Sequence, residues 1–205
     1  MTKLFVFDLG NVILPFEHRQ IGTKLYTRSE KKSELSPEQI FDFLFSRGNG
    51  LVNVYERGQM SSLEFFNQLR ERFRLSITFA EFKDIWNPIF WKNQRVIDAV
   101  EYLKSKGYPL FLLSDTNELH FAHIIDQYPI VHTFDEWILS FEVGSKKPEK
   151  RIYDVIFEKM DVQKSEVFYI DDLERNVEAA RSLGIDGLVF RDAEDLWRVI
   201  EQKGI

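Results

Sequence analysis

Three aspartates of this sequence stand directly after apolar segments, and together they can hold a metal ion. Asp8 follows the apolar run 4–7, and Asp171 and Asp172 follow the run 167–170. If both runs are parallel strands, their carboxyl ends lie at the edge of the sheet where ligands bind. Three carboxylates gathered there repel one another unless a cation neutralises them. Oxygen ligands without nearby histidine or cysteine favour magnesium, so we expect these aspartates to bind Mg²⁺.

A serine and a lysine at the same predicted edge indicate an anionic substrate. Ser114 ends the apolar run 110–113, and Lys147 lies in the loop before a predicted helix. A hydroxyl donates a hydrogen bond and an ammonium supplies positive charge, which are the groups that an anion requires. We therefore expect a phosphate group to bind here.

The rest of the chain alternates between strand and helix patterns, which specifies the fold class. Unbroken apolar runs typical of buried parallel strands occupy 4–7, 110–113, 167–170 and 188–190, with a shorter candidate at 138–139. Helical patterns occupy 94–106, 118–127, 148–160, 174–183 and 193–203. This alternation predicts an α/β fold with a doubly wound, Rossmann-like parallel sheet.

The stretch 16–91 breaks the alternation. Its amphipathic segments predict helices at 18–28, 37–47, 51–56, 62–73 and 79–86. Ser36 and Ser61 stand in positions typical of helix caps, and Asn87-Pro88 ends the stretch as a hinge should. We therefore expect an α/β core made of residues 1–15 and 92–205, with an inserted α-helical cap domain at 16–91.

Composition and charge exclude several classes of protein. The 205 residues include no cysteine, which rules out a disulfide framework, thiolate metal sites and a cysteine nucleophile. The net charge of −6 does not favour nucleic acid or anionic membranes as partners. The N-terminus has the pattern of a first strand rather than a signal peptide. We expect a cytoplasmic protein, a monomer or a weak homodimer, with no nucleic acid or membrane partner.

Four motifs in order along the chain resemble those of the haloacid dehalogenase (HAD) superfamily. They are Phe7-Asp8-Leu9-Gly10-Asn11-Val12, Leu113-Ser114-Asp115-Thr116-Asn117, Lys147-Pro148-Glu149 and Ile170-Asp171-Asp172. The predicted helical insertion stands where that superfamily places its C1 cap, so the resemblance covers nearly the whole chain. The motif details and the segment 56–61 are most similar to bacterial phosphatases of the α-D-glucose-1-phosphate phosphatase type.

The resemblance implies a nucleophile and a set of metal ligands. Asp8 would attack phosphorus to give an aspartyl-phosphate, which water then hydrolyses. Magnesium would bind Asp8, the backbone carbonyl of Gly10 and Asp172. Asp171 would be a direct or a water-mediated ligand.

The resemblance also implies groups that bind the phosphate and support the metal. Ser114 would donate a hydrogen bond to a phosphoryl oxygen, together with the backbone amide of Asp115. Lys147 would neutralise charge on the nucleophile and on the phosphoryl group. Asn176 would orient the metal ligands. Arg57 of the predicted cap either faces the substrate or is a solvated helix end.

One position departs from the usual pattern of the superfamily's phosphatases, which carry a second aspartate as general acid two residues after the nucleophile. Gly10 stands there and has no proton to donate. Loss of a general acid typically costs on the order of 10²–10⁴ in rate. Sugar 1-phosphates partly escape this cost because their leaving oxygen is less basic than an alkoxide. Candidates to replace the acid are the cap residues Glu17, His18, Glu56 and Arg57.

These residues predict a Mg²⁺-dependent phosphatase of a small phosphorylated metabolite, such as a hexose 1-phosphate. Two alternatives stay open. A metal-independent dehalogenase uses the same nucleophile on carbon, although an acidic pair without a cation is costly to bury. A catalytically weak sugar-phosphate-binding or regulatory protein would account for Gly10.

Two groups of residues have a structural interpretation. His120 and His123 are spaced like metal ligands on a helix, but no third ligand accompanies them, so we expect packing or solvent contact. Trp86, Phe90 and Trp91 flank the predicted hinge, and we expect them to pack there.

Overall fold

A five-stranded parallel sheet forms the centre of the larger lobe in the computed structural model, which describes residues 1–46 and 48–205. The strands are β1 (Leu4–Phe7), β2 (Leu110–Ser114), β3 (Glu136–Leu139), β4 (Val167–Asp171) and β5 (Asp186–Val189). Their spatial order is β3-β2-β1-β4-β5, so β1 is central. All four residues of β1 are buried, which explains its unbroken apolar sequence. The predicted α/β fold is confirmed.

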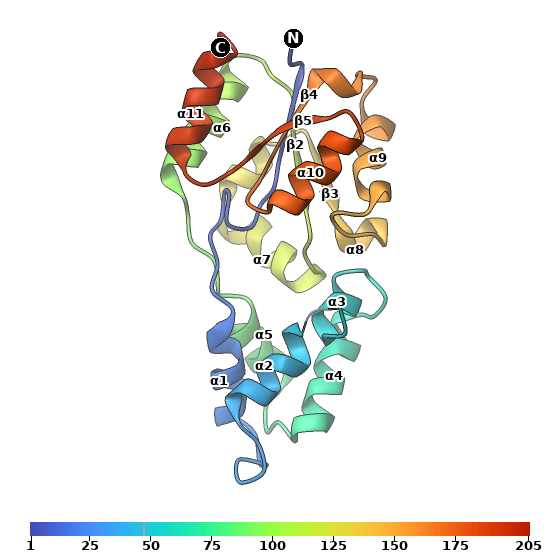
Figure 1. Ribbon diagram of the computed structural model, residues 1–205. Coiled ribbons are helices and arrows are strands. Elements are labelled where there is room, and N and C mark those ends of the chain that lie inside the picture. The colour runs from blue at the N-terminus through green and yellow to red at the C-terminus, as the bar shows by residue number, and fades with distance from the viewer. Residues whose placement is uncertain (47) are drawn as a thin grey trace.

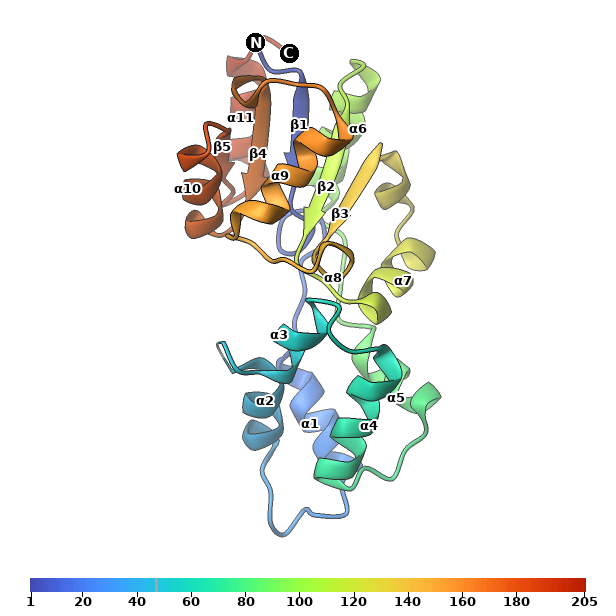
Figure 2. The same cartoon turned by 90° about the vertical axis from the view of Figure 1, so that its right-hand side faces the viewer.

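Helices cover both faces of this sheet (Figures 1 and 2). They are α6 (Gln94–Ser105), α7 (Glu118–Gln127), α8 (Ser140–Val143), α9 (Lys150–Lys159), α10 (Glu174–Ser182) and α11 (Ala193–Gln202). Phe5 and Phe7 of β1 pack with residues of α6, α7 and α11 on one face, whereas Leu4 and Val6 pack with α9 and α10 on the other. Successive strand residues point to opposite faces, so β1 contributes to both halves of the core.

Between β1 and α6 the chain builds a smaller helical lobe. Its helices are α1 (Arg19–Thr27), α2 (Pro37–Phe45), α3 (Leu51–Tyr55), α4 (Ser62–Phe73) and α5 (Phe79–Trp86). Capping boxes at Ser36, Ser61 and Thr78 fix the starts of α2, α4 and α5. The lobe has its own apolar cluster, which includes Phe65 and Trp86. The carboxyl ends of the strands point toward this lobe (Figure 2).

Each helix and strand expected from the sequence is present, and no boundary differs by more than two residues. β5 begins at Asp186 rather than at 188, because Gly187 pairs in register with Tyr169 of β4. Residue 47, the end of the helix expected over 37–47, lies outside the described residues. Three short elements were not expected: α8 and the 3₁₀ helices η1 (Pro129–Thr133) and η2 (Lys164–Glu166).

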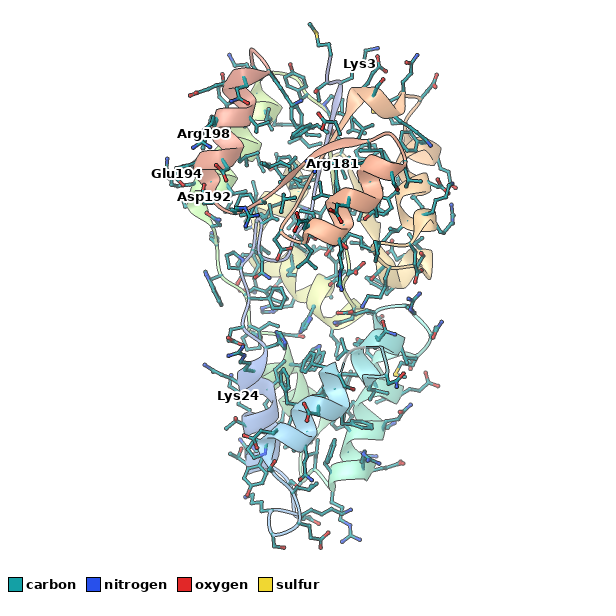
Figure 3. All side chains as sticks on the ribbon, viewed as in Figure 1. Lys3, Lys24, Arg181, Asp192, Glu194 and Arg198 are labelled. Atoms are coloured by element: carbon teal, nitrogen blue, oxygen red, sulfur yellow. The ribbon has the colours of Figure 1, made fainter. Side chains whose placement is uncertain are left out.

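The outer surface is charged. Lys3, Glu194 and Arg198 are exposed on the sheet lobe (Figure 3). Asp192 begins α11 by accepting a hydrogen bond from the amide of Asp195 at 2.9 Å. Within residues 1–46 and 48–205, no helix combines the length and the apolar character that a membrane span requires.

A buried histidine joins the two lobes at the hinge. The His120 ring stacks on the Trp86 indole, with centroids 4.9 Å apart and planes 9° apart. Its Nδ1 accepts from the Asn117 side chain at 3.1 Å, and its Nε2–H donates to the Trp86 carbonyl at 3.0 Å. His120 is therefore a packing residue, as expected. Phe90 also packs here, but Trp91 is 51% exposed, so the expected packing of Trp91 is wrong.

Burial of His120 predicts a pH-dependent stability. Burial lowers the pKa of this ring from 6.5 to about 3, so between these values the unfolded chain binds a proton that the folded chain does not. The stabilisation is complete above pH 6.5 and is lost progressively as pH falls toward 3. We expect the free energy of unfolding to fall between pH 7 and pH 5 by about 2 kcal/mol more in wild type than in His120→Gln. Exposed His132→Gln is the control, and equal falls in wild type and His120→Gln would contradict this prediction.

Candidate active site

Three carboxylates meet where the central strands end. Asp8 follows β1, Asp171 ends β4, and Asp172 comes next. One oxygen of each lies within 4.8 Å of the other two. The cause is the parallel pairing of β1 with β4, in which Phe7 lies opposite Ile170 and the residues that follow emerge side by side. The structure thus brings together the three aspartates expected to bind metal.

A buried lysine links two of these carboxylates. The Lys147 ammonium lies 2.7 Å from Asp8 Oδ1 and 2.8 Å from Asp171 Oδ2. Burial raises the pKa of Asp8 well above its usual value, and the charge of Lys147 opposes that rise. Burial also tends to raise the pKa of Asp171, but the charge of Lys147 and the hydrogen bonds from other donors hold this pKa below its usual value. The carboxylates in turn raise the pKa of Lys147 despite its burial, so Lys147 stays a cation.

Asp171 is surrounded by protein donors. Oδ1 accepts from the Leu173 amide at 2.8 Å and from Asn176 Nδ2 at 3.0 Å. Oδ2 accepts from Lys147, from Asn176 at 3.1 Å and from the buried Tyr169 hydroxyl. A carboxylate has about four acceptor positions, so these donors saturate it. Asp171 therefore positions Lys147, and Asn176 supports Asp171.

Tyr169 was not singled out in the sequence. A signal was present, because a tyrosine within a buried apolar strand needs a partner for its hydroxyl. Here that partner is the Asp171 carboxylate.

The turn after β1 shapes the rest of the site. Asn11 has a φ of +56°, a conformation that asparagine tolerates, and its Nδ2 donates to Asp172 Oδ2 at 3.3 Å. Burial raises the pKa of Asp172, and the charge of Asp171 raises it further. A Cβ at Gly10 would lie 2.9 Å from the Phe16 ring. The Phe16 ring would therefore have to shift to admit a side chain at position 10.

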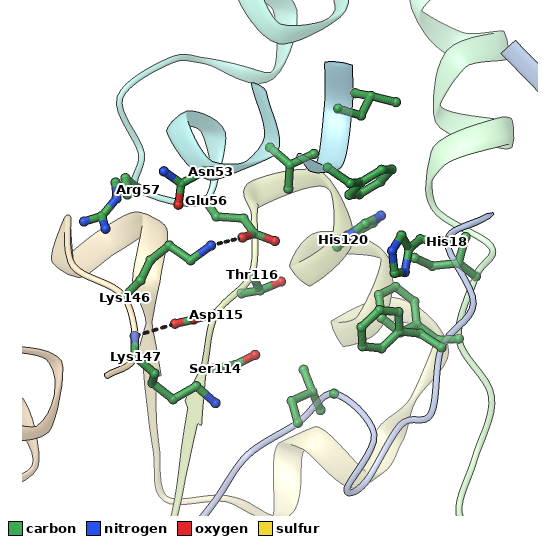
Figure 4. Close-up of a pocket in the computed structure, with 18 of the residues that line it drawn as sticks. His18, Asn53, Glu56, Arg57, Ser114, Asp115, Thr116, His120, Lys146 and Lys147 are labelled. Atoms are coloured by element: carbon green, nitrogen blue, oxygen red, sulfur yellow. Dashed lines mark hydrogen bonds and ion pairs between the residues drawn. The ribbon is translucent and has the colours of Figure 1, made fainter. Parts of the chain in front are cut away.

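A cavity of about 590 Å³ opens over these residues, between the sheet lobe and the helical lobe (Figure 4). Ser114, Asp115, Lys147 and Gly10 line its sheet side. Ser114 and Lys147 are buried, so their polar atoms face the cavity rather than bulk water. The structure thus places the residues expected to bind phosphate in the wall of a pocket.

Three of the cap residues considered as general acids also line this cavity, namely His18, Glu56 and Arg57. Glu56 forms an ion pair with Lys146. The Arg57 guanidinium makes a two-point ion pair with Glu149 across the lobes. Glu17 instead accepts a hydrogen bond from the amide of Arg19 at 2.7 Å.

Comparison with known proteins assigns the family. The model of the haloacid dehalogenase-like hydrolases matches residues 2–184. The chain belongs to this family. The resemblance noted in the four sequence motifs is therefore confirmed, and the aspartates and the lysine described above belong to a HAD hydrolase.

Two relatives with known activities are similar to this HAD hydrolase. D-ribitol-5-phosphate phosphatase of Bacteroides thetaiotaomicron is 24% identical over 206 residues, which cover 97% of this chain and 96% of the relative. A phosphorylated carbohydrates phosphatase of Thermotoga maritima is 28% identical over 127 residues, which cover 62% of this chain and 58% of the relative.

Solved structures share the fold. A HAD family enzyme of Bacteroides thetaiotaomicron, in complex with magnesium and inorganic phosphate, superposes with a TM-score of 0.80 at 24% identity, covering 93% of this chain and 95% of that one. A HAD-like hydrolase of Porphyromonas gingivalis gives a TM-score of 0.74 at 22% identity, covering 98% and 97%. Both lobes of this HAD hydrolase lie within these superpositions.

The position of Lys147 predicts a large loss of stability when its charge is removed. Lys147→Met leaves Asp8 and Asp171 buried without their cation, which we expect to lower the free energy of unfolding by about 3–5 kcal/mol in EDTA. Lys150→Met breaks the exposed pair with Asp154 and should cost less than about 0.5 kcal/mol. Urea denaturation measures both variants, and similar losses would show that Lys147 does not stabilise the site.

Proposed function

We propose that this HAD hydrolase is a Mg²⁺-dependent phosphatase of a small phosphorylated metabolite. The observation that carries the proposal is Asp8, a carboxylate that lies beside Asp172 and is held 2.7 Å from the ammonium of Lys147, a buried residue that lines the cavity. An anionic nucleophile beside a fixed cation suits attack on a phosphoryl group. The names of the two relatives, a D-ribitol-5-phosphate phosphatase and a phosphorylated carbohydrates phosphatase, support this class of substrate.

The donor set fits magnesium. Asp8, Asp172 and the backbone carbonyl of Gly10 would hold the ion, since hard oxygen ligands are those that Mg²⁺ prefers. Asp171 would act by positioning Lys147 rather than as a direct ligand, because protein donors already occupy its oxygens. A bound ion would neutralise negative charge on the phosphoryl oxygens.

The chain's own residues would then carry the reaction in two steps. An Asp8 carboxylate oxygen forms a bond to phosphorus while the bond to the leaving alcohol oxygen breaks, which gives an aspartyl-phosphate. Water then attacks that phosphorus and releases inorganic phosphate and the free carboxylate. Lys147 balances charge on Asp8 and the phosphoryl group, and Ser114 and the Asp115 amide would bind phosphoryl oxygens.

Within this class we propose a sugar phosphate such as a hexose 1-phosphate. Gly10 cannot protonate the leaving group, and an anomeric oxygen needs that help less than an ordinary alkoxide. We also propose that 16–91 acts as a cap on a core of 1–15 and 92–205, on the basis of the separate apolar cluster and the cavity between the lobes. The cytoplasmic location and the monomeric or weakly dimeric state stay predictions.

Replacing the nucleophile tests the activity. We expect Asp8→Asn to lower phosphate release from a hexose 1-phosphate and from p-nitrophenyl phosphate by at least about 10³-fold in the presence of Mg²⁺. Asp154→Asn removes the same charge from the surface of α9 and should retain activity. Retained turnover in Asp8→Asn would exclude this nucleophile. Binding of the sugar phosphate by wild type without hydrolysis would instead favour the binding or regulatory protein.

Metal binding has a readout that does not depend on activity. Saturating Mg²⁺ should raise the melting temperature of wild type by about 5 °C, since an ion that binds the folded state relieves repulsion among the three carboxylates. Asp172→Asn should abolish most of this rise, whereas Asp154→Asn should keep it. An unchanged rise in Asp172→Asn would exclude Asp172 as a ligand.

A further inference from the structure

The loop before α9 forms one wall of the cavity. The charged side chains of this wall form ion pairs with the helical lobe. Glu56, at the end of α3, pairs with Lys146, and the two side chains are only 19% and 16% exposed. Arg57 pairs with Glu149, whose carboxylate also accepts from Ser145 at 2.7 Å. Each of these charges therefore has a partner within the protein, and this wall has no net charge to offer a ligand.

The loop that carries Glu56 is pressed against the sheet lobe. Gly58 has a φ of +65°, and a Cβ at this position would lie 2.0 Å from the Phe141 carbonyl oxygen. Only glycine allows so close a contact between the two backbones. The contact fixes Glu56 and Arg57 opposite their partners in the loop before α9.

The opposite wall is aromatic. The centroid of the His18 ring lies 4.5 Å from that of Phe45 and 5.6 Å from that of Phe16. The ring centroids of Phe90 and His120 are 5.1 Å apart. Figure 4 shows His18 and His120 across the cavity from Arg57 and Lys146. Burial lowers the pKa of both histidines, to about 3 for His120, so this wall is uncharged at neutral pH.

We propose that the leaving group is an uncharged alcohol with an apolar face, and that the Glu56–Lys146 pair excludes leaving groups that carry a further charge. The inference rests on the proposed phosphatase function. A second anion beside Glu56 meets like charge, and it binds Lys146 only by breaking a buried ion pair. A cation beside Lys146 is repelled by the ammonium, and it binds Glu56 only by breaking the same ion pair. An apolar face instead packs against His18, Phe45 and Phe90.

Three aryl phosphates of similar size test the proposal. They are phenyl phosphate, 4-carboxyphenyl phosphate and 4-(aminomethyl)phenyl phosphate, with kcat/KM measured by phosphate release from wild type in Mg²⁺. We expect kcat/KM for the neutral ester to exceed that for each charged ester by on the order of tenfold. The carboxylated phenol is a slightly better leaving group than phenol, so such a preference cannot come from intrinsic reactivity.

Variants of the ion pair test its part in this preference. Glu56→Gln leaves Lys146 unpaired and should raise the kcat/KM ratio of carboxylated to neutral ester by about tenfold. Lys146→Met should raise the ratio of aminomethyl to neutral ester instead. Glu158→Gln breaks an ion pair with Arg151 on the exposed face of α9 and should change neither ratio. Because each ratio is taken within one variant, a general loss of activity does not affect it. If one variant fails to fold, the other still tests the proposal with the opposite sign.

Two results for wild type would overturn this inference without contradicting the phosphatase function. One is equal hydrolysis of charged and neutral esters, and the other is hydrolysis of sugar phosphates but not of phenyl phosphate. Unchanged ratios in Glu56→Gln and Lys146→Met overturn the role of the pair. No phosphate release from any monoester, including a hexose 1-phosphate, overturns the proposed function and this inference with it.

Discussion

The site depends on the electrostatic repulsion among three carboxylates that lie close together at one edge of a sheet. Side-by-side pairing of β1 and β4 places Asp8 and Asp171 together although 163 positions of sequence number separate them. Their mutual repulsion and burial oppose ionisation, and the Lys147 ammonium between them acts against both, enough to lower the pKa of Asp171 but not that of Asp8. Asp171 accepts hydrogen bonds from this lysine and from Asn176. The cation that faces Asp8, the proposed nucleophile, therefore comes from the same lobe as Asp8 itself.

Much of this arrangement is predictable from sequence, because apolar runs such as 4–7 and 167–170 are buried on both faces and end at functional residues. The limits of β5 were less predictable, since Asp186 and Gly187 at the sheet edge belong to no apolar run. The pairing of Glu56 with Lys146 joins residues 90 positions apart on different lobes. No local pattern encodes such a contact, because it depends on how the two lobes dock.

Gly10 and the aromatic wall are parts of one structural feature. A Cβ at position 10 would lie 2.9 Å from the Phe16 ring, and the same ring lies next to His18 in the wall. A side chain at position 10 and this aromatic wall therefore compete for one volume. The wall is present, and Gly10 stands at the usual position of a general acid. The proposed substrates, whose leaving oxygens are weakly basic, would suit both features, since they need less protonation to leave and an apolar face could pack against the wall.

Two neighbouring lysines of the cavity wall contact different lobes. Lys147 contacts Asp8 and Asp171, which belong to its own lobe, whereas Lys146 contacts Glu56 of the helical lobe. Separation of the lobes would break the contact of Lys146 and leave those of Lys147 intact. Asp8 and Lys147, which we propose to engage the phosphoryl group, would therefore keep their contact if the lobes separated. The contacts of Lys146 and Arg57 between the lobes exist only when the lobes meet, so the proposed discrimination between alcohols would belong to the docked state, in which the proposed attack by Asp8 would also be shielded from water.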